Sequence, residues 1–297
     1  MTSKLAQTLG AGRQALTAEC LPLRSGDAGA VRKLAGFFPP VLDAVVVADN
    51  PEEIGGSALA TSAILAAEKI ESVLSLVTRD RNRVSLQSDV LGAAALGVRN
   101  VLCLSGQHQA IGLCPEAAGA SDVDSIQLTQ ALSVLAGQGL DFQGRKLQSP
   151  VDLFVGAVAH PYLRPLELNL IRLKKKVAAG AKFLLTQAVF DLAGFSEWME
   201  AVRKAGLDKQ TAIIASVLPL TSLQQAQQLQ QRQTYGPIPQ DVIARLSKAA
   251  DVTAEGLALC VETATRLKSM PGVRGIHILC GGSEQLAARL IKEAGLA

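Results

Sequence analysis

The chain has 297 residues, of which 48% are hydrophobic and 19% are charged, so it can bury a large core and does not have the composition of a disordered protein. Its 29 basic and 26 acidic residues give a formal net charge of +3, which is too balanced to indicate a nucleic acid partner. Aromatic residues make up only 3%, so alanine, valine, leucine and isoleucine must build the core, as is typical of buried parallel strands covered by helices.

Short apolar runs recur along the chain, each bounded by polar residues, glycine or proline, and this pattern predicts strands buried in a parallel sheet. The predicted strands are 16–21, 44–48, 73–77, 100–104, 153–159, 183–189, 212–218 and 275–280. Helical patterns lie between them at 57–69, 87–96, 167–179, 195–205 and 223–233, and two more, 240–250 and 253–268, precede the last strand.

Eight strand–helix units predict the α/β class and a (β/α)8 TIM barrel, formed as a single domain by residues 1–297 with extra helices around 239–270. The alternative is an open doubly wound sheet. Its first turn usually carries GxGxxG, whereas residues 21–26 read LPLRSG. The pattern therefore favours the closed barrel.

The first residues lack the apolar stretch of a signal peptide, and no apolar run is long enough to span a membrane. The five cysteines include no CxxC pair and no cysteine–histidine cluster with zinc spacing. We therefore expect a cytoplasmic protein that binds no membrane, no nucleic acid and no metal.

In a barrel of this class, the chemistry is expected at the carboxyl ends of the strands. Glu19 ends the first predicted strand among apolar neighbours, where desolvation raises the pKa of a carboxyl group and suits it to general acid catalysis. A carboxylate paired with arginine or lysine inside the barrel is an equally weighted alternative. Gln187, in the sixth strand, contacts a ligand or makes a hydrogen bond in the core. His108 and His160 follow the fourth and fifth strands, where lone histidines are more often structural than catalytic.

Two further features could bind an anion at the same end of the barrel. The loop 104–107 offers backbone N–H groups that can cradle a phosphate or the edge of a flavin. A basic helical segment carries Arg172, Lys174, Lys175 and Lys176, which form either a solvated face or a contact with a diphosphate.

Several motifs, taken in order, resemble the methylenetetrahydrofolate reductase family. They are TRDRN at 78–82, LQSD at 86–89, VRNVL at 98–102 with LSG at 104–106, LKKKV at 173–177 with AGA at 179–181, and LTQ at 185–187 with FD at 190–191. The resemblance covers about residues 15–290. It implies a barrel that uses FAD to reduce 5,10-methylenetetrahydrofolate to 5-methyltetrahydrofolate, with NAD(P)H or a partner redox subunit as the electron source. We also expect a homo-oligomer or a hetero-complex.

The resemblance also implies roles for individual positions. Glu19 matches the proton donor, and the folate-binding positions are Glu19, Gln107, Gln187 and Gln225. The positions implied for FAD are Ser75, Ser105, Gly106, Gln107, His160, Arg164, Asn169, Arg172, Lys175 and Lys176.

The chain departs from the family pattern at several of its functional positions. Gln107 stands where the family commonly has aspartate, which removes a negative charge beside the flavin and predicts a higher flavin potential. Other departures are Ala48 for a hydroxyl-bearing residue, Ser75 for histidine, His160 for an aromatic residue, Leu229 for phenylalanine and Ser283 for arginine. They predict weaker FAD binding and reduced direct use of NADH. The alternatives are a catalytic subunit fed by a partner protein, a flavin-free pterin-binding methyltransferase or lyase, and a non-catalytic subunit.

Overall fold

The computed structural model describes residues 2–50, 53–112, 114–232 and 235–296. Eight parallel strands follow one another around a closed barrel, in which β8 pairs with β1. The predicted TIM barrel is confirmed, and the open-sheet alternative is wrong. The strands are β1 Ala15–Cys20, β2 Ala44–Val47, β3 Ser72–Val77, β4 Asn100–Leu104, β5 Phe154–Ala159, β6 Phe183–Ala188, β7 Ala212–Val217 and β8 Val273–Ile278.

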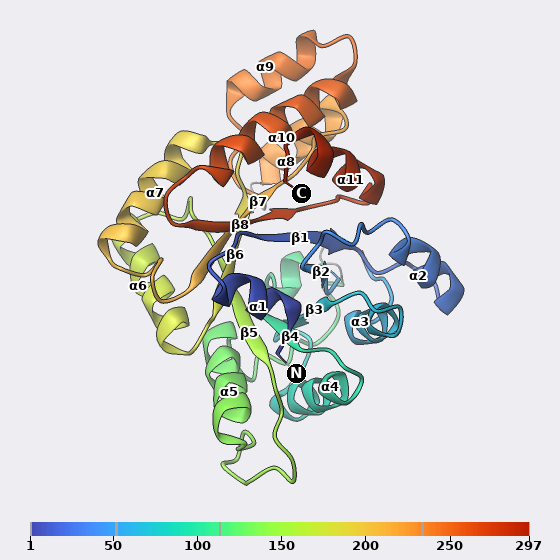
Figure 1. Ribbon diagram of the computed structural model, residues 1–297, viewed down its shortest axis with the longest axis vertical. Helices are drawn as coiled ribbons and strands as arrows, with labels where there is room; N and C mark the ends of the chain where they lie inside the picture. Colours follow the sequence, from blue (N-terminus) through green and yellow to red (C-terminus); the bar gives the residue numbers. More distant parts are fainter. Residues whose placement is uncertain (1, 51–52, 113, 233–234, 297) are drawn as a thin grey trace.

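An outer ring of helices surrounds the strands (Figure 1). It comprises α2 Ala28–Ala35, α3 Ala58–Ala67, α4 Arg83–Ala95, α5 Ser125–Gln138, α6 Leu166–Ala178, α7 Leu192–Lys204, α10 Val252–Lys268 and α11 Glu284–Glu293, and a short 3-10 helix, η1, spans Gln109–Ile111. In the described ranges, none of these helices has both the length and the apolar character needed to cross a membrane.

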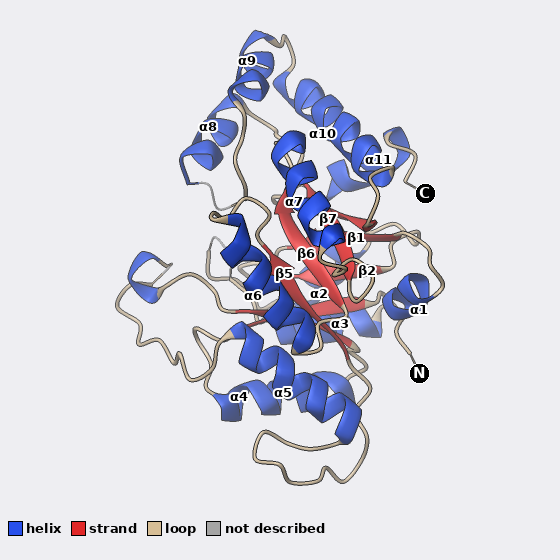
Figure 2. Cartoon of the chain, turned by 90° about the vertical axis from the view of Figure 1, so that its left-hand side faces the viewer, coloured by secondary structure: helices blue, strands red, loops and turns tan. Residues whose placement is uncertain are grey.

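Extra helices are inserted between β7 and β8. Helix α8 spans Leu223–Arg232 and α9 spans Gln240–Lys248, and both precede α10. Figure 2 shows α8 and α9 extending beyond the ring, on the side away from the N terminus. The insertion therefore brings additional side chains toward one end of the barrel.

Helix α1 (Lys4–Gly10) lies in front of the strands in Figure 1 and closes the N-terminal end of the barrel. Leu5 and Leu9 belong to the apolar cluster that fills this end of the interior. The carboxylate of Glu71 accepts hydrogen bonds from the backbone N–H groups of Lys4 at 2.6 Å and Leu5 at 3.0 Å, which satisfies donors that a helix start leaves unpaired. The carboxyl ends of the strands are consequently the end at which to look for a ligand.

The interior changes from apolar to polar along the barrel axis. Ala15 belongs to the inner apolar cluster, so the alternation of side chains along β1 directs Thr17 and Glu19 to the same inner face. Ser75 follows Val73 on the inner face of β3 by the same alternation. Buried polar groups in an otherwise apolar barrel need partners, so this polar layer marks the region where function is expected.

Candidate active site

Glu19 lies at the carboxyl end of β1 with only 7% of its surface exposed. The backbone N–H of Gly281 donates to Glu19 Oε2 at 3.4 Å. Gly281 and Gly282 follow β8 with φ values of +54° and +80°, a left-handed conformation that glycine adopts without a steric penalty. The turn after β8 thereby lies beside the carboxyl group of Glu19.

The cysteines that flank this carboxyl group are not poised to react. Burial and the negative charges of Glu284 and Glu19 raise the pKa of the Cys20 thiol to about 12. Burial and the same two charges also raise the pKa of the Cys280 thiol. Because the thiolate is the reactive form, neither residue is a nucleophile at neutral pH. Of the two carboxyl groups beside these thiols, Glu19 is the more buried and is the candidate for proton chemistry.

A buried histidine lies in the layer beneath Glu19, and the sequence analysis missed it. His277 is 3% exposed, and its Nδ1 lies 2.9 Å from Thr17 Oγ1. Burial lowers the pKa of His277 to about 3, against the opposing effect of its contact with Thr17, so the ring is neutral at physiological pH. A histidine in the apolar run 275–280 was the available sequence signal, of the same kind that identified Glu19.

Gln187 lies at an irregularity in the barrel wall. The register between β6 and β7 shifts between Leu185 and Ala188. Ser216 spans the shift, because its N–H donates to Thr186 Oγ1 at 3.0 Å and its hydroxyl donates to the Thr186 carbonyl at 2.6 Å. Irregularities of this kind redirect side chains near functional sites. Gln187 is half-buried at the carboxyl end of β6, on the same end of the barrel as Glu19.

Gln225 reaches the same region from α8. Its side-chain Oε1 accepts hydrogen bonds from the Thr221 backbone N–H at 2.8 Å and from the Thr221 hydroxyl, Oγ1, at 3.0 Å. The backbone N–H of Gln225 donates to Ser222 Oγ at 3.1 Å. A β-carbon built on Gly281 would lie 3.7 Å from Gln225 Nε2. Gly281 therefore lies next to both Gln225 and Glu19. The S-x-x-Q pattern at 222–225 is a capping signature readable in the sequence.

The loop after β4 is held against β3 and α5. Gly106 has φ +77°, and a β-carbon there would lie 2.6 Å from Val77 Cγ1. Ser105 Oγ donates to Ser125 Oγ at 3.0 Å and accepts from Ser125 N–H at 3.2 Å. Gln107 is exposed beyond this anchored segment. The loop thus has a fixed path that requires glycine at position 106.

Basic groups meet at the rim formed by β5 and α6. Desolvation and the positive charges of Lys176 and Arg172 lower the pKa of His160 to about 4, although the imidazole is solvent-accessible. Lys176 is 8% exposed and its Nζ donates to the Val158 carbonyl at 2.6 Å, while burial and the charge of Arg172 lower its pKa to about 8. Arg172 and Lys175 are exposed and make no ion pair with any other described residue. Such a group of cations favours an anionic ligand.

Other positions expected to bind a cofactor have structural contacts. Asn169 Nδ2 donates to the carbonyls of His160 at 2.8 Å and Leu163 at 3.1 Å, which fixes the β5–α6 loop. Arg164 pairs with Glu197 of α7 at 2.6 Å. Ser75 is 3% exposed on the inner face of β3. His108, whose Nδ1 accepts from the Ala110 N–H, is turned toward its own loop.

The TRDRN segment builds the rim between β2 and β3. Arg81 Nη1 lies 2.6 Å from the buried Asp49 Oδ2, and Arg81 Nε lies 3.0 Å from Asp89 Oδ2. Asp49 also accepts from the Val77 N–H at 3.0 Å. Asn82 caps α4 by accepting from two backbone N–H groups. The sequence analysis did not assign this network, which holds the strand ends around the mouth.

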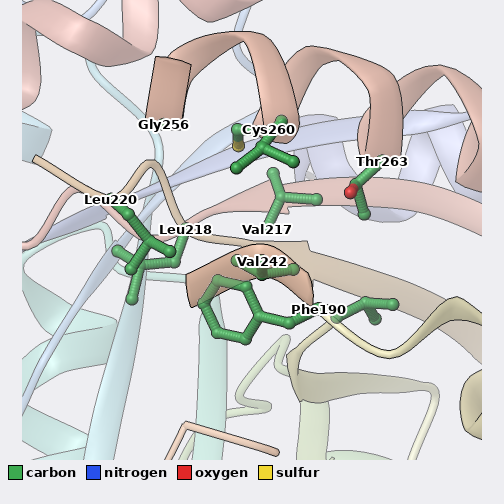
Figure 3. Close-up of a pocket in the computed structure, with 10 residues that line it drawn as sticks. Phe190, Val217, Leu218, Leu220, Val242, Gly256, Cys260 and Thr263 are labelled. Carbon is green, nitrogen blue, oxygen red and sulfur yellow. The ribbon is translucent and has the colours of Figure 1, made fainter. Parts of the chain in front are cut away.

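A separate cavity of about 20 Å³ lies between the end of β7 and the helices α9 and α10 (Figure 3). Phe190, Val242 and Cys260 are among its mostly apolar lining residues. A volume of this size holds about one water molecule and no folate or flavin. In the described ranges, no cluster of three histidine, cysteine or acidic residues could hold a metal ion. The mouth of the barrel is the candidate active site because Glu19, Gln187 and Gln225 lie there.

A family model described as methylenetetrahydrofolate reductase matches residues 30–295. The chain belongs to the methylenetetrahydrofolate reductase family. This finding confirms the resemblance carried by the sequence motifs, and it agrees with a mouth that presents the buried carboxyl group of Glu19 together with Gln187 and Gln225.

Curated relatives with this name are distant in sequence. Methylenetetrahydrofolate reductase 2 of Saccharomyces cerevisiae is 28% identical over 154 residues, which cover 48% of this chain and 25% of the yeast protein. 5,10-Methylenetetrahydrofolate reductase of Escherichia coli K12 is 28% identical over 132 residues, which cover 44% of this chain and 38% of the bacterial protein. A probable methylenetetrahydrofolate reductase (NADPH) of Caenorhabditis elegans is 21% identical over 251 residues, which cover 83% of this chain and 36% of the nematode protein. The chain thus spans between 25% and 38% of the length of these relatives.

Solved structures share the barrel at low sequence identity. An uncharacterized protein from Clostridium thermocellum, described as binding two copies of 5-methyl-5,6,7,8-tetrahydrofolic acid, superposes with a TM-score of 0.68 at 15% identity and covers 98% of each chain. 2,3-Dimethylmalate lyase superposes with a TM-score of 0.52 at 12% identity, covering 100% of this chain and 86% of the lyase. At such identities, the likeness shows the fold alone.

Proposed function

We propose that this protein reduces 5,10-methylenetetrahydrofolate to 5-methyltetrahydrofolate with bound FAD, and that Glu19 is the proton donor. One observation carries the proposal: a buried carboxyl group lies at the open end of a barrel of this family, next to the Gly281 turn that Gln225 also approaches. The activity in the names of the relatives, and the methylated folate in the description of the Clostridium thermocellum protein, support the same substrate class.

In the proposed reaction, the methylene carbon of the substrate bridges two nitrogens, N5 and N10. Glu19 delivers a proton to N10, directly or through a water molecule, so that the ring opens to an iminium at N5. When bound, reduced flavin supplies the hydride that this carbon accepts. Gln187 and Gln225 orient the folate, and the barrel walls exclude bulk water.

The residues at the rim between β4 and α6 have the charges and hydrogen-bond donors that binding of FAD requires. Arg172 and Lys175 have no ion-pair partner among the described residues, and Lys176 lies near Arg172, so a diphosphate would relieve the repulsion between like charges. The anchored loop at Gly106 would present backbone N–H groups to the flavin ring. These residues would hold the cofactor, whereas Asn169 would act by fixing the loop beside it.

FAD affinity should fall by up to about tenfold as the pH rises from 7 to 9.5. The lowered pKa of Lys176, about 8, means that its ammonium group is charged below this pH and neutral above it. A bound diphosphate would raise that pKa, so affinity is lost from about pH 8 upward. Fluorescence titration of FAD at several pH values measures the effect. Lys176→Met should bind FAD weakly with a flatter pH profile, and an equal pH dependence in both proteins would contradict a role for Lys176.

Gln107→Asp should lower the midpoint potential of the flavin by about 30 mV, which corresponds to about 1.4 kcal/mol for a two-electron couple. The added carboxylate would destabilise the anionic reduced flavin beside it. Equilibration with a redox dye measures the potential, and Gln107→Asn serves as the neutral control. An unchanged potential in the aspartate variant would refute the placement of Gln107 next to the flavin.

A second candidate is a catalytic subunit that receives electrons from a protein partner. The departures at Ala48, His160, Leu229 and Ser283 favour it, because they replace residues that the family pattern associates with cofactor, nicotinamide or folate contacts. Formation of 5-methyltetrahydrofolate should be measured with NADH, NADPH or a reduced viologen dye as donor. The proposed function requires product with the dye, and its absence with all three donors would refute the function. Rapid NADH oxidation by the isolated protein would exclude the need for a partner, whereas a colourless protein unable to take up FAD would favour the flavin-free alternative.

A further inference from the structure

We infer that Thr221 is a positioning residue that fixes which end of the Gln225 amide faces the barrel mouth. The fixed orientation makes Gln225 a hydrogen-bond donor to the ligand, so the folate must present an acceptor atom there. This inference rests on the proposed function, because folate is taken as the ligand of the mouth.

The hydrogen bonds of Gln225 determine the orientation of its amide. Its Oε1 accepts from both the N–H and the hydroxyl of Thr221, at 2.8 and 3.0 Å. A side-chain amide oxygen has two acceptor sites, so Thr221 uses both. A flipped amide would turn its NH2 group toward the Thr221 N–H, and two donors would then face each other. The amide nitrogen consequently has to point elsewhere.

That nitrogen lies on the side of the active site. Gln225 Nε2 is 3.7 Å from the position that a β-carbon of Gly281 would occupy, and the Gly281 N–H lies 3.4 Å from Glu19 Oε2. The amide of Gln225 therefore presents N–H donors close to the candidate proton donor. A ligand between them would be recognised by acceptor atoms, such as a ring nitrogen or a carbonyl oxygen.

Thr221 is itself held in place from two directions. Thr253, in the first turn of α10, donates from its hydroxyl to the Thr221 carbonyl at 3.0 Å. Ser222 accepts from the Gln225 N–H at 3.1 Å and so starts α8 at a fixed point. The same contacts would also be expected if Thr221 served only to cap α8. The two roles differ in whether the effect of Thr221 on ligand binding requires Gln225.

A double-mutant cycle separates these roles. The variants are Thr221→Val, Thr221→Ser, Gln225→Ala and the Thr221→Val/Gln225→Ala double variant. Each is measured as the FAD-loaded protein for flavin content, for the Kd of 5-methyltetrahydrofolate, and for kcat and KM with the methylene substrate. Thr221→Val should raise Kd and KM about threefold to tenfold, with kcat changed less than about twofold, because it removes one of the two bonds that orient the amide.

Thr221→Ser should restore binding, and Thr221→Val should have no further effect once Gln225 is alanine. Thr265→Val, which removes an exposed hydroxyl bonded only within α10, should match the wild type. The inference would be overturned if the Thr221→Val variant bound folate as tightly as the wild type. It would also be overturned if Thr221→Val weakened binding by the same factor whether residue 225 was glutamine or alanine. Either result would leave the proposed function intact. A flavin-loaded wild type that binds no 5-methyltetrahydrofolate would overturn both.

Discussion

Glu19→Gln should lower the rate of methylenetetrahydrofolate reduction by about 100-fold or more while FAD stays bound. A positioned general acid contributes on the order of 10²–10⁴ in rate. Glutamine keeps the shape of the side chain and can still accept the Gly281 N–H bond, but it has no acidic proton to deliver. The measurement is a single-turnover reaction, in which substrate reoxidises the pre-reduced flavin and the visible absorbance returns.

Glu284→Gln is the matched control for this prediction. Glu284 lies on α11 and, like Glu19, adds to the negative charge around Cys20 and Cys280, but it is not placed in the reaction. Its variant should react at close to the wild-type rate. If Glu19→Gln reduced the folate as fast as the wild type with equal flavin content, another group would have to supply the proton.

The free energy of unfolding should fall by about 2 kcal/mol between pH 6.5 and pH 5 because of His277 alone. The folded protein holds this histidine neutral, with a pKa lowered to about 3, whereas an unfolded chain titrates near 6.5. As the pH falls below 6.5, the unfolded chain takes up a proton that the folded protein cannot accept, so folding loses stability. The loss continues until the pH approaches the folded pKa. Urea denaturation at the two pH values measures it.

His277→Asn separates this effect from the titration of other groups. Asparagine can still bond Thr17 but does not titrate, so the variant should lose about 2 kcal/mol less than the wild type over the same pH range. His108→Asn, at an exposed site, should behave as the wild type. Equal losses in the wild type and in His277→Asn would show that His277 is not held neutral in the folded protein.

The strands could be predicted from the sequence because burial on both faces leaves an apolar run. All eight predicted runs overlap a strand of the barrel. The predicted bounds of the eighth strand, 275–280, lie further along the chain than those of β8, which spans Val273–Ile278. Cys280 is 5% exposed although it lies beyond the strand, so its apolar character reports burial and not strand pairing.

Several helices were harder to predict from the sequence than the strands. The sequence analysis assigned no helix to α1, α2, α5 or α11, and it began α4 four residues late, at 87 instead of Arg83. Short helices such as α1, with seven residues, derive their stability from tertiary contacts, here the Glu71 carboxylate and the inner cluster. The start of α4 could have been read from Asn82, whose side chain caps it.

Candidate site residues could be selected from the sequence where a polar residue interrupts an apolar strand. Glu19 and Gln187 follow this rule, and His277 follows it equally although it was missed. The proximity of Gln225 to Glu19 could not be read from the sequence, because it depends on α8 approaching the Gly281 turn more than 50 residues later in the chain. The partner of Arg164 was unpredictable for the same reason, since Glu197 lies on α7, after α6 and β6 in the chain.

The proposed function requires a pterin to exchange electrons with a flavin at the mouth of the barrel. The visible spectrum of the pure protein under anaerobic conditions is the most direct test of this exchange. The protein reconstituted with FAD should show an oxidised flavin band, and 5-methyltetrahydrofolate should bleach that band as the reaction runs in reverse. A bound flavin whose spectrum does not change with excess 5-methyltetrahydrofolate, or a protein that binds no flavin at all, would contradict the proposed chemistry.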